Sequence, residues 1–115
     1  MKNQTAIQER YMRDDLPVLL GGLAANLARI ESFSDHPDHR EVVERLLEES
    51  KFFIEWTVPD ASLDVQAELV ELQLQLARWQ HSWADIWADA EQRTAMAQQA
   101  QDWSQRVLKM AGLLP

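Results

Sequence analysis

Apolar residues recur every three or four positions in each long segment of this chain, and no segment alternates apolar with polar residues. This spacing places apolar side chains on one face of an α-helix, whereas a half-buried β-strand requires alternation. Three glycines and four prolines are also too few for a turn-rich β-sandwich. We therefore expect an all-α protein. Because 115 residues make one ordinary core, we expect residues 1–115 to form a single domain.

Four long amphipathic helices follow from the apolar faces and the helix stop signals. We expect them near residues 16–33, 37–56, 60–88 and 89–111, after a short helical segment near 4–13. Asp60 or Ser62 caps the third helix, and Asp89 with Gln92 resembles a capping box for the fourth. Gly112 ends it. Short loops favour antiparallel neighbours, so the sequence predicts an up-down-up-down antiparallel four-helix bundle with a short extra N-terminal segment.

Small residues occupy part of the helix predicted over 16–33. They are Gly21, Gly22, Ala24, Ala25 and Ala28. Such a surface lets another helix approach closely, and a mid-helix glycine pair can alternatively mark a kink. We expect helix packing here rather than a phosphate-binding loop, because no strand precedes the glycines.

The helix predicted over 60–88 carries two apolar stripes. The first consists of Val65, Leu69, Leu72, Leu76, Trp79, Trp83 and Ile86. The second consists of Leu63, Val70, Leu74, Ala77 and His81, more than roughly 100° around the helix from the first. A row of glutamines, Gln66, Gln73 and Gln80, runs between them. A bundle helix normally needs only one stripe, so the second requires a cover.

Two covers remain open for the second stripe. The segment near 4–13 can fold back and place Ile7 and Tyr11 on it, or a second protein molecule can bind there. The sequence therefore predicts a non-enzymatic interaction or adaptor protein, homodimeric through this stripe or bound to a partner helix. His81 and the glutamine row would then set the polar register of the interface.

Tryptophans offer an alternative function. Trp79, Trp83 and Trp87 lie on successive helical turns, and with Trp103 they can form a pocket for a flat aromatic ligand or a tetrapyrrole. The competing interpretation is that they fill the wide end of the bundle, where Trp56 and Trp103 meet them.

Charge and residue usage exclude several other functions. A net charge of −8, from 11 basic and 19 acidic residues, disfavours nucleic acids and anionic membranes. Without cysteine there is no thiolate site, and His36 and His39 flank a helix start without the Glu-x-x-His spacing of a di-iron bundle. We therefore expect no metal, no cofactor and no catalytic residue. We also expect a cytoplasmic location, because no targeting or membrane-spanning segment is seen.

Two stretches carry a resemblance to known sequences. They are LGGLAANLARI at 20–30 and EESKFFIEWTVP at 48–59. With them, the chain resembles short uncharacterised all-helical proteins of cyanobacteria. The resemblance implies a cyanobacterial source and a cytoplasmic setting, and it brings no functional residue with it.

Overall fold

The structure, a computed structural model, describes residues 16–114, and every regular element in that range is a helix. The α-helices are α2 (Leu16–Phe33), α3 (Arg40–Thr57), α4 (Leu63–His81), α5 (Trp83–Ala88) and α6 (Ala90–Met110). Two short 3-10 helices, η1 (Pro37–His39) and η2 (Val58–Asp60), precede α3 and α4. The all-α prediction is confirmed. The segment predicted near 4–13 lies outside the described residues.

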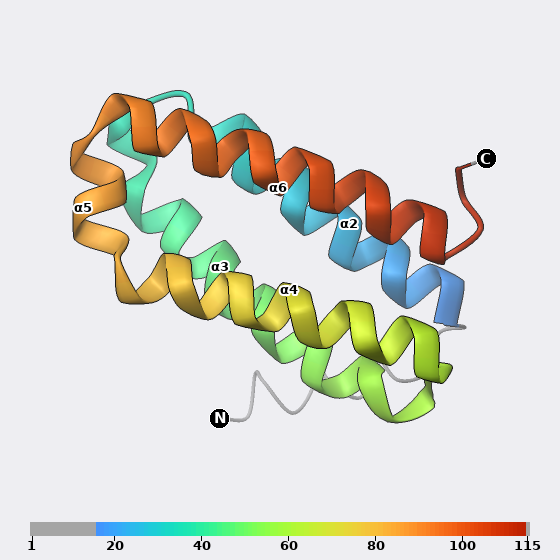
Figure 1. The fold of residues 1–115 in the computed structure, drawn as a ribbon. Coiled ribbons are helices and arrows are strands. Elements are labelled where there is room, and N and C mark those ends of the chain that lie inside the picture. Colours follow the sequence, from blue (N-terminus) through green and yellow to red (C-terminus); the bar gives the residue numbers. More distant parts are fainter. Residues whose placement is uncertain (1–15, 115) are drawn as a thin grey trace, which may run out of the picture.

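The helices are arranged around one apolar core (Figure 1). α2 packs against both α3 and α6, α3 packs against α4, and α5 crosses one end of the molecule between α4 and α6. Fully buried core side chains come from α2, α3, α4 and α6, and include Leu23, Leu27, Val43, Leu47, Leu69, Leu72, Leu76, Ala100 and Val107. Within the described range, no helix combines the length and the hydropathy needed to cross a membrane.

The contact between α2 and α6 is close because small residues line it. Ala24 is buried, and its carbonyl oxygen accepts a hydrogen bond from the Ser104 hydroxyl of α6 at 2.8 Å. A Cβ atom added to Gly21 would lie 3.2 Å from the Leu113 side chain, which is tighter than an ordinary contact. Gly22 and Ala25 are exposed, so only part of the small-residue surface is used in this contact.

Three predicted helix boundaries are confirmed at residue level. The Ser62 hydroxyl accepts the N–H of Val65 and caps α4, and the Asp89 carboxylate accepts the N–H of Glu91 and caps α6. Gly112 has a φ of 75°, a left-handed conformation that glycine adopts without steric cost. These boundaries depend on local hydrogen bonds, so the sequence identifies them directly.

The prediction of one continuous helix over 60–88 is wrong, because the chain bends at Ser82. Ser82 leaves helical geometry with φ −102° and ψ 20°, and α5 then turns across the end of the molecule (Figure 1). A straight helix of that length would extend beyond α2 and α3, each of 18 residues or about 27 Å. The bend instead buries Trp83, Ile86 and Trp87 over the end of the core.

Candidate protein–protein interface

The second apolar stripe lies on the surface of the described chain. Leu63, Val70 and Leu74 expose 83%, 52% and 53% of their surface, and Ala77 and His81 are exposed as well. The α4 members of the first stripe face the core, where Leu69, Leu72, Leu76 and Trp79 are buried and Val65 is half-buried. α4 therefore has an apolar face inside the molecule and a second one facing solvent.

One residue of this face was missed by the sequence analysis. Ala67 is exposed and lies between Leu63 and Val70 on the same side of α4. The signal was present in the sequence, because its addition gives an unbroken alternation of four- and three-residue steps. We call this set the α4 outer surface, made of Leu63, Ala67, Val70, Leu74, Ala77 and His81.

A groove lies beside the middle of the α4 outer surface. It has a volume of about 310 Å³ and runs between the end of α3, η2 and α4. Its walls are formed by Ile54, Glu55, Val58, Pro59, Val70, Gln73 and Leu74. Val70 and Leu74 therefore border a mostly apolar depression, and an incoming side chain finds apolar atoms on both sides.

Two of the three glutamines between the stripes hold α4 to its neighbours in the chain. The Gln66 amide donates to the Val58 carbonyl at 2.7 Å. The Gln80 amide accepts from the Lys51 ammonium and donates to the Glu48 carboxylate, each at 2.9 Å. These amides serve contacts within the chain, in contrast to the intermolecular role that the sequence analysis gave them.

Gln73, the middle glutamine, differs from the other two. Its amide oxygen is buried, and it has no hydrogen-bond partner within residues 16–114. Gln73 also lines the groove beside Val70 and Leu74. A buried acceptor without a donor is unfavourable, so a donor group arriving at the groove would be stabilising.

The tryptophans of α5 seal one end of the core. Trp83 and Trp87 lie with ring centroids 5.1 Å apart, and both are buried. The Trp87 indole N–H donates to the Pro37 carbonyl at 2.8 Å, which fixes α5 against the start of η1. The Arg93 guanidinium donates to the Trp87 carbonyl at 2.8 Å and lies 5.4 Å from its ring. Packing over the end of the core therefore accounts for the presence of both rings in α5.

Trp79, Trp83, Trp87 and Trp103 all belong to the buried core of the described residues, but Trp83 and Trp103 line different grooves. Trp103 lies in α6 beneath the Arg106 guanidinium, 3.8 Å from its ring, and lines a groove of about 290 Å³. Trp83 lines a different groove, and Trp79 is buried in the core. Trp56 stacks on Phe52 in the last turns of α3, far along that helix from the η1 end that Trp87 contacts.

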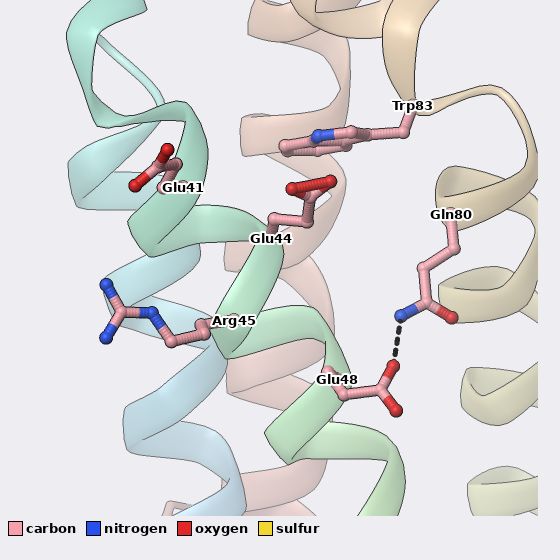
Figure 2. Close-up of a pocket in the computed structure, with 6 residues that line it drawn as sticks. All are labelled: Glu41, Glu44, Arg45, Glu48, Gln80 and Trp83. Carbon is pink, nitrogen blue, oxygen red and sulfur yellow. Dashed lines mark hydrogen bonds between the residues drawn. The ribbon is translucent and has the colours of Figure 1, made fainter.

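An acidic groove of about 610 Å³ opens between α3 and the α4–α5 bend (Figure 2). It is lined by Glu41, Glu44, Arg45, Glu48, Gln80 and Trp83. In Figure 2 the Glu44 carboxylate points toward the Trp83 ring, and the Gln80–Glu48 hydrogen bond closes the groove at its other end. The groove was missed by the sequence analysis, although the spacing of its three glutamates on one helix face was visible.

The histidines near η1 stabilise helix ends. His36 accepts the N–H of Asp38 through its Nδ1 at 3.2 Å and caps η1. His39 Nδ1 lies 3.0 Å from the Phe33 carbonyl oxygen, and its ring meets the Phe33 ring edge-on. In the part of the chain that the structure describes, no group of three or more histidines and carboxylates is arranged to hold a metal ion.

No family model matches this chain, and no curated protein or solved structure is significantly similar to it. The resemblance to cyanobacterial proteins therefore stays a prediction. On the surface of the described residues, the α4 outer surface carries three of the six exposed large hydrophobic side chains, Leu63, Val70 and Leu74, on one face of one helix.

Proposed function

We propose that this protein is a non-enzymatic interaction module that forms a homodimer through the α4 outer surface. The observation that carries the proposal is the exposure of Leu63, Val70 and Leu74 on one face of one helix. Full burial of a side chain of this size stabilises by about 1.5–3 kcal/mol, so three together favour association strongly. Contiguous apolar surface of this kind marks interaction sites in soluble proteins.

The distribution of charge restricts where a second copy of the same chain can bind. Two molecules that each carry −8 repel each other over most of their surfaces. The α4 outer surface has no acidic side chain and is apolar from Leu63 to Ala77, with His81 at its end. It offers two acidic molecules an apolar contact that is itself free of carboxylates, with Glu71 on its flank.

We also propose that the four long helices form the up-down-up-down bundle predicted from the sequence, with α5 as a bridge between α4 and α6. The short connections around η1 and η2 and the packing of α2 on α3 and α6 support this arrangement. The bundle would present the α4 outer surface on a rigid helix, which lowers the entropic cost of association.

The test is the double substitution Val70→Glu with Leu74→Glu, compared with the wild type by sedimentation equilibrium. The wild type should have a concentration-dependent mass that approaches a dimer, and the variant should be a folded monomer with unchanged helical circular dichroism. Two carboxylates placed in the centre of the interface cannot be desolvated without a large cost.

The matched control is Thr94→Glu with Gln98→Glu, which adds the same charge at the same four-residue spacing on the exposed side of α6. This variant should dimerise like the wild type. A wild type that sediments as a monomer at all concentrations contradicts the proposal, and so does a Val70→Glu/Leu74→Glu variant of undiminished mass.

A further inference from the structure

We infer that the two copies pair through α4 in an antiparallel orientation, about a two-fold axis level with Leu72; the inference rests on the proposed homodimer. Along the α4 outer surface the residue steps are four, three, four, three and four. This is the seam of a coiled coil, and the series is the same in both directions along the helix. A helix with such a seam can meet an antiparallel copy of itself at every position.

This register pairs side chains of matching size. Val70 meets Leu74 of the second copy, and Ala67 meets Ala77 of the second copy, each contact occurring twice because of the two-fold symmetry. The alanine layers allow the two helices to approach closely on each side of the central Val–Leu layers. Leu63 covers His81 of the second copy at each end of the seam.

Charges that flank the seam favour the antiparallel orientation over the parallel one. Asp64 lies in the first turn of α4 and Arg78 in its last turn. The antiparallel pairing brings Asp64 next to Arg78 of the second copy at both ends, whereas a parallel pairing sets this charged flank against the glutamine flank of the second copy and forms no such ion pair. The antiparallel arrangement also opposes the two helix dipoles.

Glu71 is the one acidic residue that lies near the axis on this flank. Its carboxylate is 3.4 Å from the Arg106 guanidinium of the same chain, and that guanidinium is also 3.8 Å from Glu68. Because Arg106 supplies a positive charge beside Glu71, the repulsion between the two Glu71 side chains across the axis is reduced.

Gln73 occupies the other flank of the seam close to the axis. Its buried amide oxygen has no hydrogen-bond partner among the described residues. A side-chain amide carries both donors and an acceptor, so two Gln73 side chains related by the axis can bond to each other reciprocally. Once each Gln73 side chain rotates its amide out to the seam, the antiparallel register gives a partner to an oxygen that has none within residues 16–114.

The experiment uses the absence of cysteine from the chain, which makes single-cysteine variants unambiguous. Ala67→Cys and Ala77→Cys are prepared separately, with an affinity tag on one of them, then unfolded, refolded together and oxidised. The mixture should yield the tagged–untagged disulfide dimer about tenfold in excess over either like-with-like product, because only unlike cysteines come within disulfide distance. Ala95→Cys, exposed on α6, is the control and should cross-link with neither.

Each other outcome has a distinct meaning. A wild type that sediments as a monomer overturns the homodimer and this inference with it. A dimeric wild type whose variants cross-link mainly like with like, or do not cross-link, overturns the antiparallel register and leaves the homodimer standing.

Discussion

At the scale of single residues, the two buried indoles of α5 contact each other but have different polar partners. The Trp87 N–H donates to the Pro37 carbonyl, whereas the Trp83 N–H has no hydrogen-bond partner within residues 16–114. Both rings are more than nine-tenths buried and contact each other. Their polar contacts differ in this hydrogen bond and in the Arg93 guanidinium, which lies 5.4 Å from the Trp87 ring.

The substitution Trp87→Phe should therefore lower the free energy of unfolding more than Trp83→Phe does, by about 1–2 kcal/mol. Both changes remove comparable apolar area, but only the first breaks a hydrogen bond, while the second removes a donor that is already unpaired. Urea unfolding followed by circular dichroism measures both values, with each variant serving as the control for the other. Equal losses would show that the Trp87–Pro37 bond contributes nothing.

At the scale of helices, the α2–α6 contact shows how small residues set the distance between two elements. The Ser104 hydroxyl reaches the Ala24 backbone only because no large side chain separates the two helices. The contact of α4 with α3 and η2 is of another kind, held at its edges by the amides of Gln80, which bonds to Lys51 of α3, and Gln66, which bonds to Val58 of η2. Small residues therefore hold α6 close to α2, whereas side-chain hydrogen bonds hold α4 in place on the other side of the core.

We expect Ser104→Val to lower the free energy of unfolding by about 2 kcal/mol or more. The change removes a buried hydrogen bond, worth about 0.5–1.5 kcal/mol, and forces extra methyl groups into the contact at a further cost of about 1–3 kcal/mol. Ser104→Ala is the matched control, because it removes the hydrogen bond without adding volume, and it should lose only about 1 kcal/mol. If Ser104→Val is as stable as Ser104→Ala, α6 does not lie close to α2.

The elements differ in how far the sequence could predict them. Ser62, Asp89 and Gly112 were identifiable because a cap is made by a residue and its immediate neighbours. The bend at Ser82 was not, because no proline or glycine marks it, and the core that buries Trp83, Ile86 and Trp87 beyond it is assembled only by the fold. For the same reason, the sequence could not show that Trp83 and Trp103 line different grooves, because the position of Trp83 depends on that bend.

The candidate interface was partly predictable for a similar reason. The exposure of Leu63, Val70 and Leu74 followed from their angle on a single helix, which depends on helical geometry alone. The bonds of Gln66 and Gln80 to neighbouring elements, and the groove beside Gln73, depend on how α3 lies against α4. Helix faces are therefore readable from the sequence, and what lies next to a face requires the fold.

At the scale of the whole molecule, dimerisation should link stability to concentration. The melting temperature of the wild type should rise by about 3 °C for each tenfold increase in protein concentration, because the dimer is favoured over two unfolded chains by mass action. The Val70→Glu/Leu74→Glu variant should melt at one temperature throughout. Differential scanning calorimetry over a hundredfold concentration range measures both, and a concentration-independent wild type would contradict a dimer that persists to the melting point.

The hydrogen bond between Ser104 and Ala24 spans 80 positions of the chain, so the fold is completed late during synthesis. At about 5–20 residues per second, a ribosome makes Ser104 some 4–16 s after Ala24. Throughout that interval the nascent chain carries α2 without the helix that covers its small-residue face. The contact between α2 and α6 therefore forms only after α6 has been translated.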